Sequence, residues 1–383
     1  MLTFRVPSGP VEGEYDGVLL FTDLEADDAL ALTVLAPRLA RVPTLAVVSE
    51  GDADKTELCC GYLHCVGLDA HASVVQGRRS STPFPKAILD LYIPDAASSK
   101  AAVLKRPDSL PLECNNVELA NERYAASQVE AFVEKCKAPL AIVLKPPDEL
   151  VHISTASRAK ITVAIYGSFN MTQMLGRHWS KGEEPMQVEF MRSFRATLWV
   201  ERSVACGRDC SLHAALAPTL WTAAVEDQPT IQQHIRLWNK AIVKRSCRDI
   251  GMSEKEILQL MEAKDMSADE VARRVVAAGN NGKRVETRLN KIILPNVRVD
   301  CLQVCHADTL VVACLVDDDG KLGPHLLQAT NPVRSEDGIR FKNVPGAGGL
   351  GRIAALVAEP GPPREACIEA SIQALTAAIS GRS

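Results

Sequence analysis

Long apolar runs are missing from this 383-residue sequence. No stretch approaches the roughly 18 consecutive apolar residues that a membrane-spanning helix needs. The first residues, MLTFRVPSGPVEGEYDG, also lack the basic start and apolar core of a secretory signal. We therefore expect a cytoplasmic protein with no membrane partner.

A strong excess of one charge is missing as well. The chain has 43 Lys and Arg residues against 47 Asp and Glu residues, which gives a formal net charge of −4. Proteins that bind nucleic acid usually carry a basic excess, so we expect no nucleic-acid partner. Hydrophobic residues make up 46 % of the chain, enough to bury a large core, and we treat residues 1–383 as one α/β domain.

Several common catalytic motifs are also missing. The sequence contains no P-loop, no GxSxG nucleophile elbow and no HExxH zinc motif. Residues 346–351 formally match GxGxxG, but too little chain follows them for a dinucleotide-binding unit. Residues 352–357 are more typical of a strand than of a helix, so we predict a loop at 346–351.

Cysteine is present in quantity, but without the spacing of a disulfide framework. Its 12 residues are scattered, and in a reducing compartment we expect small buried hydrophobic side chains or free thiols. Two close pairs, Cys206 with Cys210 and Cys301 with Cys305, leave a structural zinc site as the less favoured alternative.

Short apolar runs alternate with helical patterns along the chain. We predict strands at 18–21, 43–48, 72–75, 139–144 and 161–166, and helices after residue 28 and over 55–66 and 119–136. This order predicts a mostly parallel central sheet flanked by helices on both faces. In such sheets ligands gather outside the carboxyl ends of the strands.

Three segments interrupt this rhythm. Residues 80–116 and 173–192 have little regular pattern, and we expect irregular lid segments there. Residues 253–256 and 267–270 each match a capping box, in which a serine and a glutamate bond the first turn of a helix. We therefore expect a helical hairpin inserted at about 250–285.

The segment 17–32, GVLLFTDLEADDALAL, holds the strongest functional signal. Asp23 is expected at the carboxyl end of a buried strand, and Asp27 and Asp28 in the first turn of the helix that follows. Converging carboxylates repel one another unless a cation neutralises them, and such oxygen ligands suit Ca²⁺ or Mg²⁺. The alternative is a solvated helix start, since the helix dipole favours acidic residues there by under about 1 kcal/mol each.

Two segments resemble the signatures of the nucleoside hydrolases. Residues 23–32, DLEADDALAL, resemble the N-terminal DxDPGxDDAxAL signature, and residues 306–313, HADTLVVA, resemble the C-terminal HDPLAVA-like segment. Weaker similarities lie between them in the same order, at 74–77, 146–150 and 165–168. The resemblance implies a nucleoside-hydrolase-like fold over most of the chain, from about residue 17 to 380.

The resemblance also implies a bound Ca²⁺ that chelates the ribose of the substrate. By position, the side chains of Asp23, Asp28 and Asp308 would be metal ligands, and the backbone carbonyl of Asp148 would complete the coordination. Asp27 would bind the ribose or assist the metal shell. Asp23 would act as the base for a metal-bound water that attacks C1′ and breaks the N-glycosidic bond.

Other positions receive weaker assignments from the same resemblance. Asp52, Asn170 and Glu201 stand near places where the family binds substrate. We place His306 at a strand end, one residue before the usual position of the histidine that protonates the leaving base. It is either a displaced acid or a histidine with a local structural role.

Two functions follow. The first is a Ca²⁺-dependent ribohydrolase, a glycosidase of nucleoside salvage that acts on a ribonucleoside or related N-riboside and forms homo-oligomers. The second is a catalytically impaired relative that serves as a binding or assembly subunit. Phe21 in place of the first signature aspartate and Ala307 in place of the histidine favour the second.

Overall fold

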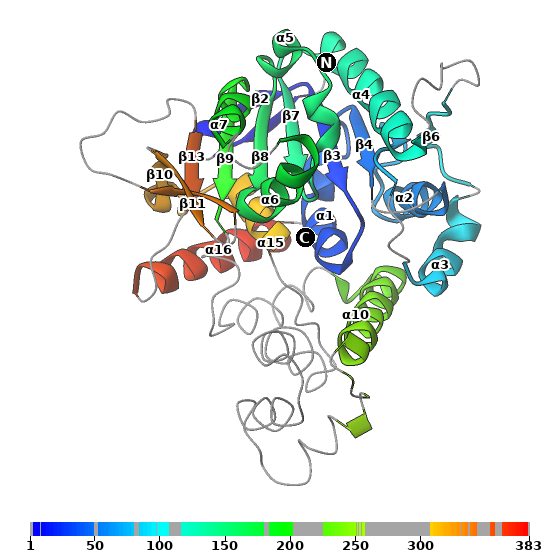
Figure 1. The fold of residues 1–383 in the computed structure, drawn as a ribbon. Coiled ribbons are helices and arrows are strands. Elements are labelled where there is room, and N and C mark those ends of the chain that lie inside the picture. The colour runs from blue at the N-terminus through cyan, green and yellow to red at the C-terminus, as the bar shows by residue number, and fades with distance from the viewer. Residues whose placement is uncertain are drawn as a thin grey trace.

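A nine-stranded sheet with the order β10-β13-β9-β8-β7-β3-β4-β5-β6 forms the centre of the structure (Figure 1). Its strands are parallel except β10, which pairs antiparallel with β13. The prediction of a mostly parallel sheet is therefore confirmed. The strands are β3 (Gly17–Thr22), β4 (Thr44–Val48), β5 (Ala72–Gln76), β6 (Ala102–Val103), β7 (Pro139–Val143), β8 (Thr162–Tyr166), β9 (Ala196–Val200), β10 (Leu326–Gln328) and β13 (Ile353–Leu356).

This computed structural model describes residues 3–7, 9–49, 53–79, 84–96, 98–106, 116–179, 184–201, 225–249, 251, 253, 255–256, 307–329, 331–335, 338–342, 353–356 and 362–381. Two small antiparallel pairs lie outside the central sheet, namely β1 (Phe4–Val6) with β2 (Gly13–Tyr15) and β11 (Asn331–Ser335) with β12 (Gly338–Lys342). Short helices are η1 (Gly9–Val11), η2 (Asp148–Val151), α5 (Thr155–Arg158) and η5 (Gly323–His325).

The central strands are apolar throughout because helices cover both faces of the sheet. In β3, Val18 and Leu20 contribute to one hydrophobic core, while Leu19 and Phe21 contribute to the other. This alternation is the two-residue period of a strand that is buried on both sides.

Two sets of helices form the outer layers (Figure 1). Residues of one set pack into the first core, and residues of the other set pack into the second. The first set is α1 (Ala26–Leu39), α2 (Ala53–Cys65), α3 (Lys86–Ala96), α10 (Pro229–Asp249), α15 (Ala307–Leu315) and α16 (Pro362–Ser380), and the second is α4 (Val117–Lys135), α6 (Gly167–His178) and α7 (Glu184–Arg192).

The expected irregular lids are wrong for most of residues 173–192 and for part of residues 80–116. Residues 80–116 contain α3, whose Tyr92 packs closely against Gly61 of α2. A side chain at Gly61 would place its Cβ 2.6 Å from Tyr92 Cβ, so the missing side chain allows the two helices to meet. Residues 173–192 lie mostly in α6 and α7.

The predicted hairpin at 250–285 and the GxGxxG segment at 346–351 lie almost wholly outside the described residues. The first capping box is confirmed, since Ser253 N donates to Glu256 Oε2 at 2.7 Å and Glu256 N donates to Ser253 Oγ at 3.2 Å. Seven cysteines in the described part are free, and six of these are buried. Within the described ranges, no helix combines the length and apolar character needed to cross a membrane.

Candidate functional site

The turn between β3 and α1 supplies the first acidic side chain of the site. Leu24 in this turn has a φ of 52°, in the left-handed region that leucine rarely adopts. Its amide donates to Thr22 Oγ1 at 3.0 Å, and its carbonyl accepts a hydrogen bond from His234 Nε2 at 3.1 Å. These contacts hold a conformation that costs about 1–3 kcal/mol and leave half-buried Asp23 at the carboxyl end of β3.

Asp28 fastens the start of α1 to the end of β3. Its Oδ1 accepts hydrogen bonds from the Thr22 hydroxyl and, at 3.2 Å, from the backbone amide of Asp23. Asp28 is buried, and the neighbouring Asp27 is half-buried. Both lie in the first turn of α1, where the helix dipole favours negative charge.

A second helix from the other end of the chain brings in a further aspartate. α15 packs against α1, and the buried Asp308 lies in its first turn. One carboxylate oxygen each from Asp27, Asp28 and Asp308 lie within 4.8 Å of one another. We call these three residues the aspartate group.

The electrostatics of the aspartate group reflect burial and mutual repulsion. Burial raises the pKa of Asp28 well above its usual range, and the charges of Asp23 and Asp27 raise it further. Burial likewise raises the pKa of Asp308, and the charges of Asp27, Asp28 and Asp23 raise it further. Asp23 therefore lies close enough to interact with the group, and the arrangement opposes full ionisation unless positive charge is supplied.

The aspartate group fits a hard divalent cation. Oδ1 of Asp308 is buried and has no hydrogen-bond partner among the described residues. A buried polar atom without a partner carries a desolvation cost, which coordination to a metal ion would remove. Carboxylate oxygens are the preferred ligands of Ca²⁺ and Mg²⁺, so the donor set suits either ion.

Asp148, Asn170 and Glu201 follow β7, β8 and β9, and so lie near the same carboxyl edge of the sheet. All three are buried. Asn170 Nδ2 has no hydrogen-bond partner within the described ranges, and Glu201 Oε1 accepts a bond from Trp199 Nε1 at 3.1 Å. Asp52 and His306 lie outside the described residues.

The side chain of Asp148 does not belong to the aspartate group. Its two oxygens accept hydrogen bonds from Arg177 Nη2 and His178 Nε2, each at 2.8 Å. Burial raises the pKa of Asp148, but the bond from His178 and the charges of Arg177 and Lys145 outweigh burial and lower it. The assignment of its backbone carbonyl to the metal stays a prediction.

The expected strand end at His306 lies outside the described residues and stays a prediction. The chain that follows it is the helix α15, whose residues from Thr309 to Leu315 are all buried. A helix that is buried on every side shows no polar stripe, so its sequence pattern resembles that of a buried strand.

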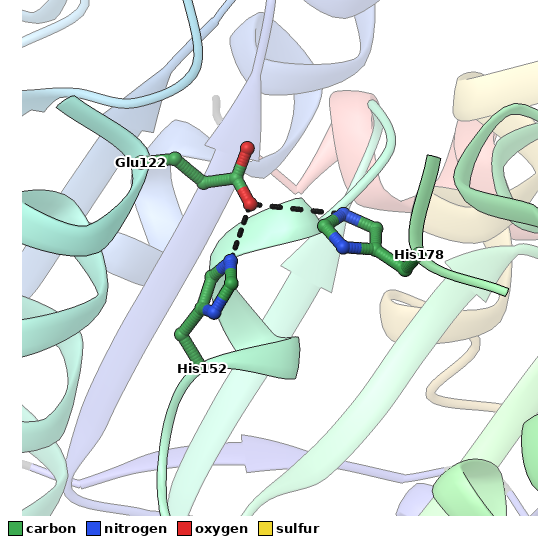
Figure 2. A group of neighbouring side chains, drawn as sticks. All are labelled: Glu122, His152 and His178. Carbon is green, nitrogen blue, oxygen red and sulfur yellow. Dashed lines mark hydrogen bonds and ion pairs between the residues drawn. The ribbon is translucent and has the colours of Figure 1, made fainter. Parts of the chain in front are cut away.

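Two polar groups near the strand ends carry no sequence signal that points to them. Lys145 Nζ lies 2.9 Å from Glu149 Oε2, and both side chains are fully buried. Figure 2 shows the second group, in which Glu122, His152 and His178 point toward one another. These three come from α4, the end of η2 and the end of α6, and only the fold brings them together.

No protein-family model matches the sequence, and the comparison with curated proteins finds no relative. The motifs and the geometry of the chain therefore carry the functional proposal.

Proposed function

We propose that this chain is a nucleoside-hydrolase-like enzyme that hydrolyses the N-glycosidic bond of a ribonucleoside or related N-riboside and depends on Ca²⁺. The supporting observation is the convergence of Asp27, Asp28 and Asp308 at the carboxyl edge of a parallel sheet. Both segments that resemble the nucleoside hydrolase signatures supply this group. A scaffold alone has no physical need for buried carboxylates that raise one another's pKa.

The cation ligands are Asp23, Asp28 and Asp308, with Asp148 contributing its backbone carbonyl. When bound, the ion would polarise a water molecule and align the ribose hydroxyls. Half-buried Asp27 is accessible from the site and accepts a hydrogen bond from a ribose hydroxyl.

Asp23 takes the proton of the attacking water. It stands at the end of β3, where its Oδ1 accepts a long hydrogen bond of 3.3 Å from the Glu25 amide. The water oxygen bonds to C1′ while the bond from C1′ to the base nitrogen breaks. The surrounding carboxylates stabilise the positive charge that develops on the ribose ring, and His306 returns a proton to the leaving base.

Ribose release from a panel of purine and pyrimidine ribonucleosides tests this function. We expect release with Ca²⁺ and none with a chelator, and we expect Asp23→Ala to lower kcat by about 10²–10⁴-fold, as for loss of a general base. Asp318→Asn is the matched control, because Asp318 is an exposed partner of Arg38 away from the aspartate group. Release that persists in the chelator, or in Asp23→Ala, would contradict the proposal.

One observation favours the second function, a relative that binds but does not turn over its ligand. Phe21 replaces the first aspartate of the signature and is fully buried in the core beneath α4, α6 and α7. Lys145 Nζ lies 5.4 Å from the centroid of its ring. Ca²⁺-dependent ribose binding without hydrolysis of any nucleoside in the panel would support this second function.

A further inference from the structure

Glu122, His152 and His178, which we call the His–Glu cluster, form a group of ligand atoms distinct from the aspartate group. Figure 2 shows these three side chains. The cluster residues lie in or next to α4, η2 and α6, which contribute to the second core. The aspartate group lies on α1 and α15, which contribute to the first core. Glu122 is buried, while His152 and His178 are partly exposed, so the cluster opens to solvent on the histidine side.

The ligand atoms of the cluster already lie close together. His152 Nε2 is 2.5 Å and His178 Nε2 is 3.7 Å from the same oxygen, Glu122 Oε1. The two imidazole rings meet edge to face, with centroids 5.7 Å apart. One ligand atom from each of the three residues falls within 4.8 Å of the others.

We propose that the His–Glu cluster is a Zn²⁺ site. Two imidazole nitrogens and one carboxylate oxygen form a donor set that zinc accepts in proteins, with a fourth position left for another ligand. Asp148 Oδ1 lies 2.8 Å from His178 Nε2 but outside this group of mutually close ligand atoms, so we assign the fourth position to a water molecule. Zinc is favoured over calcium here because imidazole nitrogen is a poor ligand for calcium.

The observed spacing requires only small movements to receive the ion. Bond lengths of about 2.0 Å in a tetrahedral zinc site place neighbouring ligand atoms about 3.3 Å apart. The Glu122–His152 pair is closer than this, at 2.5 Å, and the Glu122–His178 pair is farther, at 3.7 Å. In the metal-free protein, a proton on each Nε2 fills the place that the metal would take.

Two arginines bind the outer oxygens of the carboxylates. Arg177 binds Asp148 Oδ2 at 2.8 Å, and Arg78 Nη1 lies 3.6 Å from Glu122 Oε2, while Arg78 Nη2 lies 3.5 Å from Glu118. The inner oxygens are thereby directed toward the histidines. The three carboxylates and two guanidiniums leave one net negative charge beside the histidines, which is favourable for a divalent cation.

Cobalt provides the probe, since Co²⁺ occupies zinc sites and reports tetrahedral coordination by visible absorption. We expect metal-free full-length protein to bind one equivalent of Co²⁺ with an intense tetrahedral band that Zn²⁺ abolishes. His152→Ala and His178→Ala are each expected to weaken binding by about 100-fold or more. His64→Ala serves as the matched control, because His64 pairs with Asp69 at the end of α2, away from the cluster.

Two further variants keep the test decisive. His152→Gln replaces the more exposed of the two histidines. It tests the zinc site even if His178→Ala fails to fold. Circular dichroism of the metal-free variants checks that each one is folded. Asp308→Asn changes a residue of the aspartate group and should leave the cobalt band unchanged. This variant therefore separates failure of the calcium proposal from failure of the zinc proposal. The zinc proposal is contradicted if wild-type protein shows no tetrahedral cobalt band. It is also contradicted if a folded His152 variant keeps the band.

Discussion

At the scale of single residues, Gly77 is a position where one added atom would disturb a buried ion pair. A Cβ at Gly77 would lie 2.0 Å from Glu149 Oε1 and 2.7 Å from Ser49 Oγ. Glu149 Oε1 also accepts a hydrogen bond from the Arg78 amide at 3.0 Å, and Ser49 Oγ accepts one from Lys145 Nζ at 2.6 Å. The glycine therefore makes room for a buried ion pair that ties the ends of β4, β5 and β7 together.

We expect Gly77→Ala to lower the free energy of unfolding by about 1–3 kcal/mol, the usual cost of overpacking a buried site. Gly323→Ala is the matched control, because a Cβ there meets nothing within 4 Å, and it should change stability by under about 0.5 kcal/mol. Denaturant unfolding measures both. Equal effects of the two substitutions would show that the close approach at Gly77 is unimportant.

The buried Lys145–Glu149 pair leads to a second prediction. Lys145→Met leaves the carboxylate of Glu149 buried without its cation and should cost about 3–5 kcal/mol. Arg38→Met breaks the more exposed pair with Asp318 and should cost about 0–1 kcal/mol. The double variant Lys145→Met/Glu149→Leu should recover stability in the same denaturant assay. A double variant no more stable than Lys145→Met would contradict the charge-based explanation.

At the scale of elements, α10 is joined to two other parts of the fold through His234. Its Nε2 donates to the Leu24 carbonyl at 3.1 Å, and its Nδ1 accepts a bond from the Tyr92 hydroxyl of α3 at 3.0 Å. Accepting the bond from Tyr92 at Nδ1 requires a neutral imidazole. Burial lowers the pKa of His234 to about 4, and the positive charge of Lys55 also lowers it, while the bond to Leu24 opposes the shift.

The sign of the resulting pH dependence follows from this lowered pKa. Between pH 6.5 and 4 the unfolded chain binds a proton at His234 that the folded chain refuses, so stability falls on acidification. From pH 7 to pH 5 this histidine alone should cost about 2 kcal/mol. His234→Gln should remove that part of the pH dependence. The measurement is the free energy of unfolding of wild type and variant at each pH. Parallel pH profiles for wild type and variant would contradict the prediction.

The elements that the sequence predicts well are those with a clear local pattern. The strands predicted at 43–48, 72–75, 139–144 and 161–166 are confirmed, as are the helices at 55–66 and 119–136. α3 was not predicted, because the prolines and small residues around it hide a helix that forms by packing on α2. α15 was not predicted, because its burial on all sides removes the helical period.

At the scale of the whole molecule, the aspartate group is assembled from both ends of the chain. The acidic residues at 23–28 are close together in the sequence, so the sequence alone predicted the part of the site that they form. Asp308 joined the prediction through a family resemblance, and the α1–α15 contact brings it to the same place. The His–Glu cluster could not be predicted, because its residues lie on separate segments with no common spacing and meet only through the packing of α4, η2 and α6.

From the proposed metal site we predict that calcium stabilises the whole molecule. In calcium-free protein at pH 7, Asp308→Asn should raise the free energy of unfolding, because it removes one of the converging negative charges. In wild type, added Ca²⁺ should raise the melting temperature, whereas the variant should not respond. A calcium-dependent rise of equal size in both proteins would place the ion elsewhere.

The most direct test of the account is a calorimetric titration of metal-free protein with Ca²⁺, followed by ribose. We predict one bound Ca²⁺ in wild type and in Asp318→Asn, no binding in Asp308→Asn, and ribose binding only when Ca²⁺ is present. Absence of Ca²⁺ binding to wild type, or equal binding to Asp308→Asn, would contradict the proposed metal site and the hydrolase that depends on it.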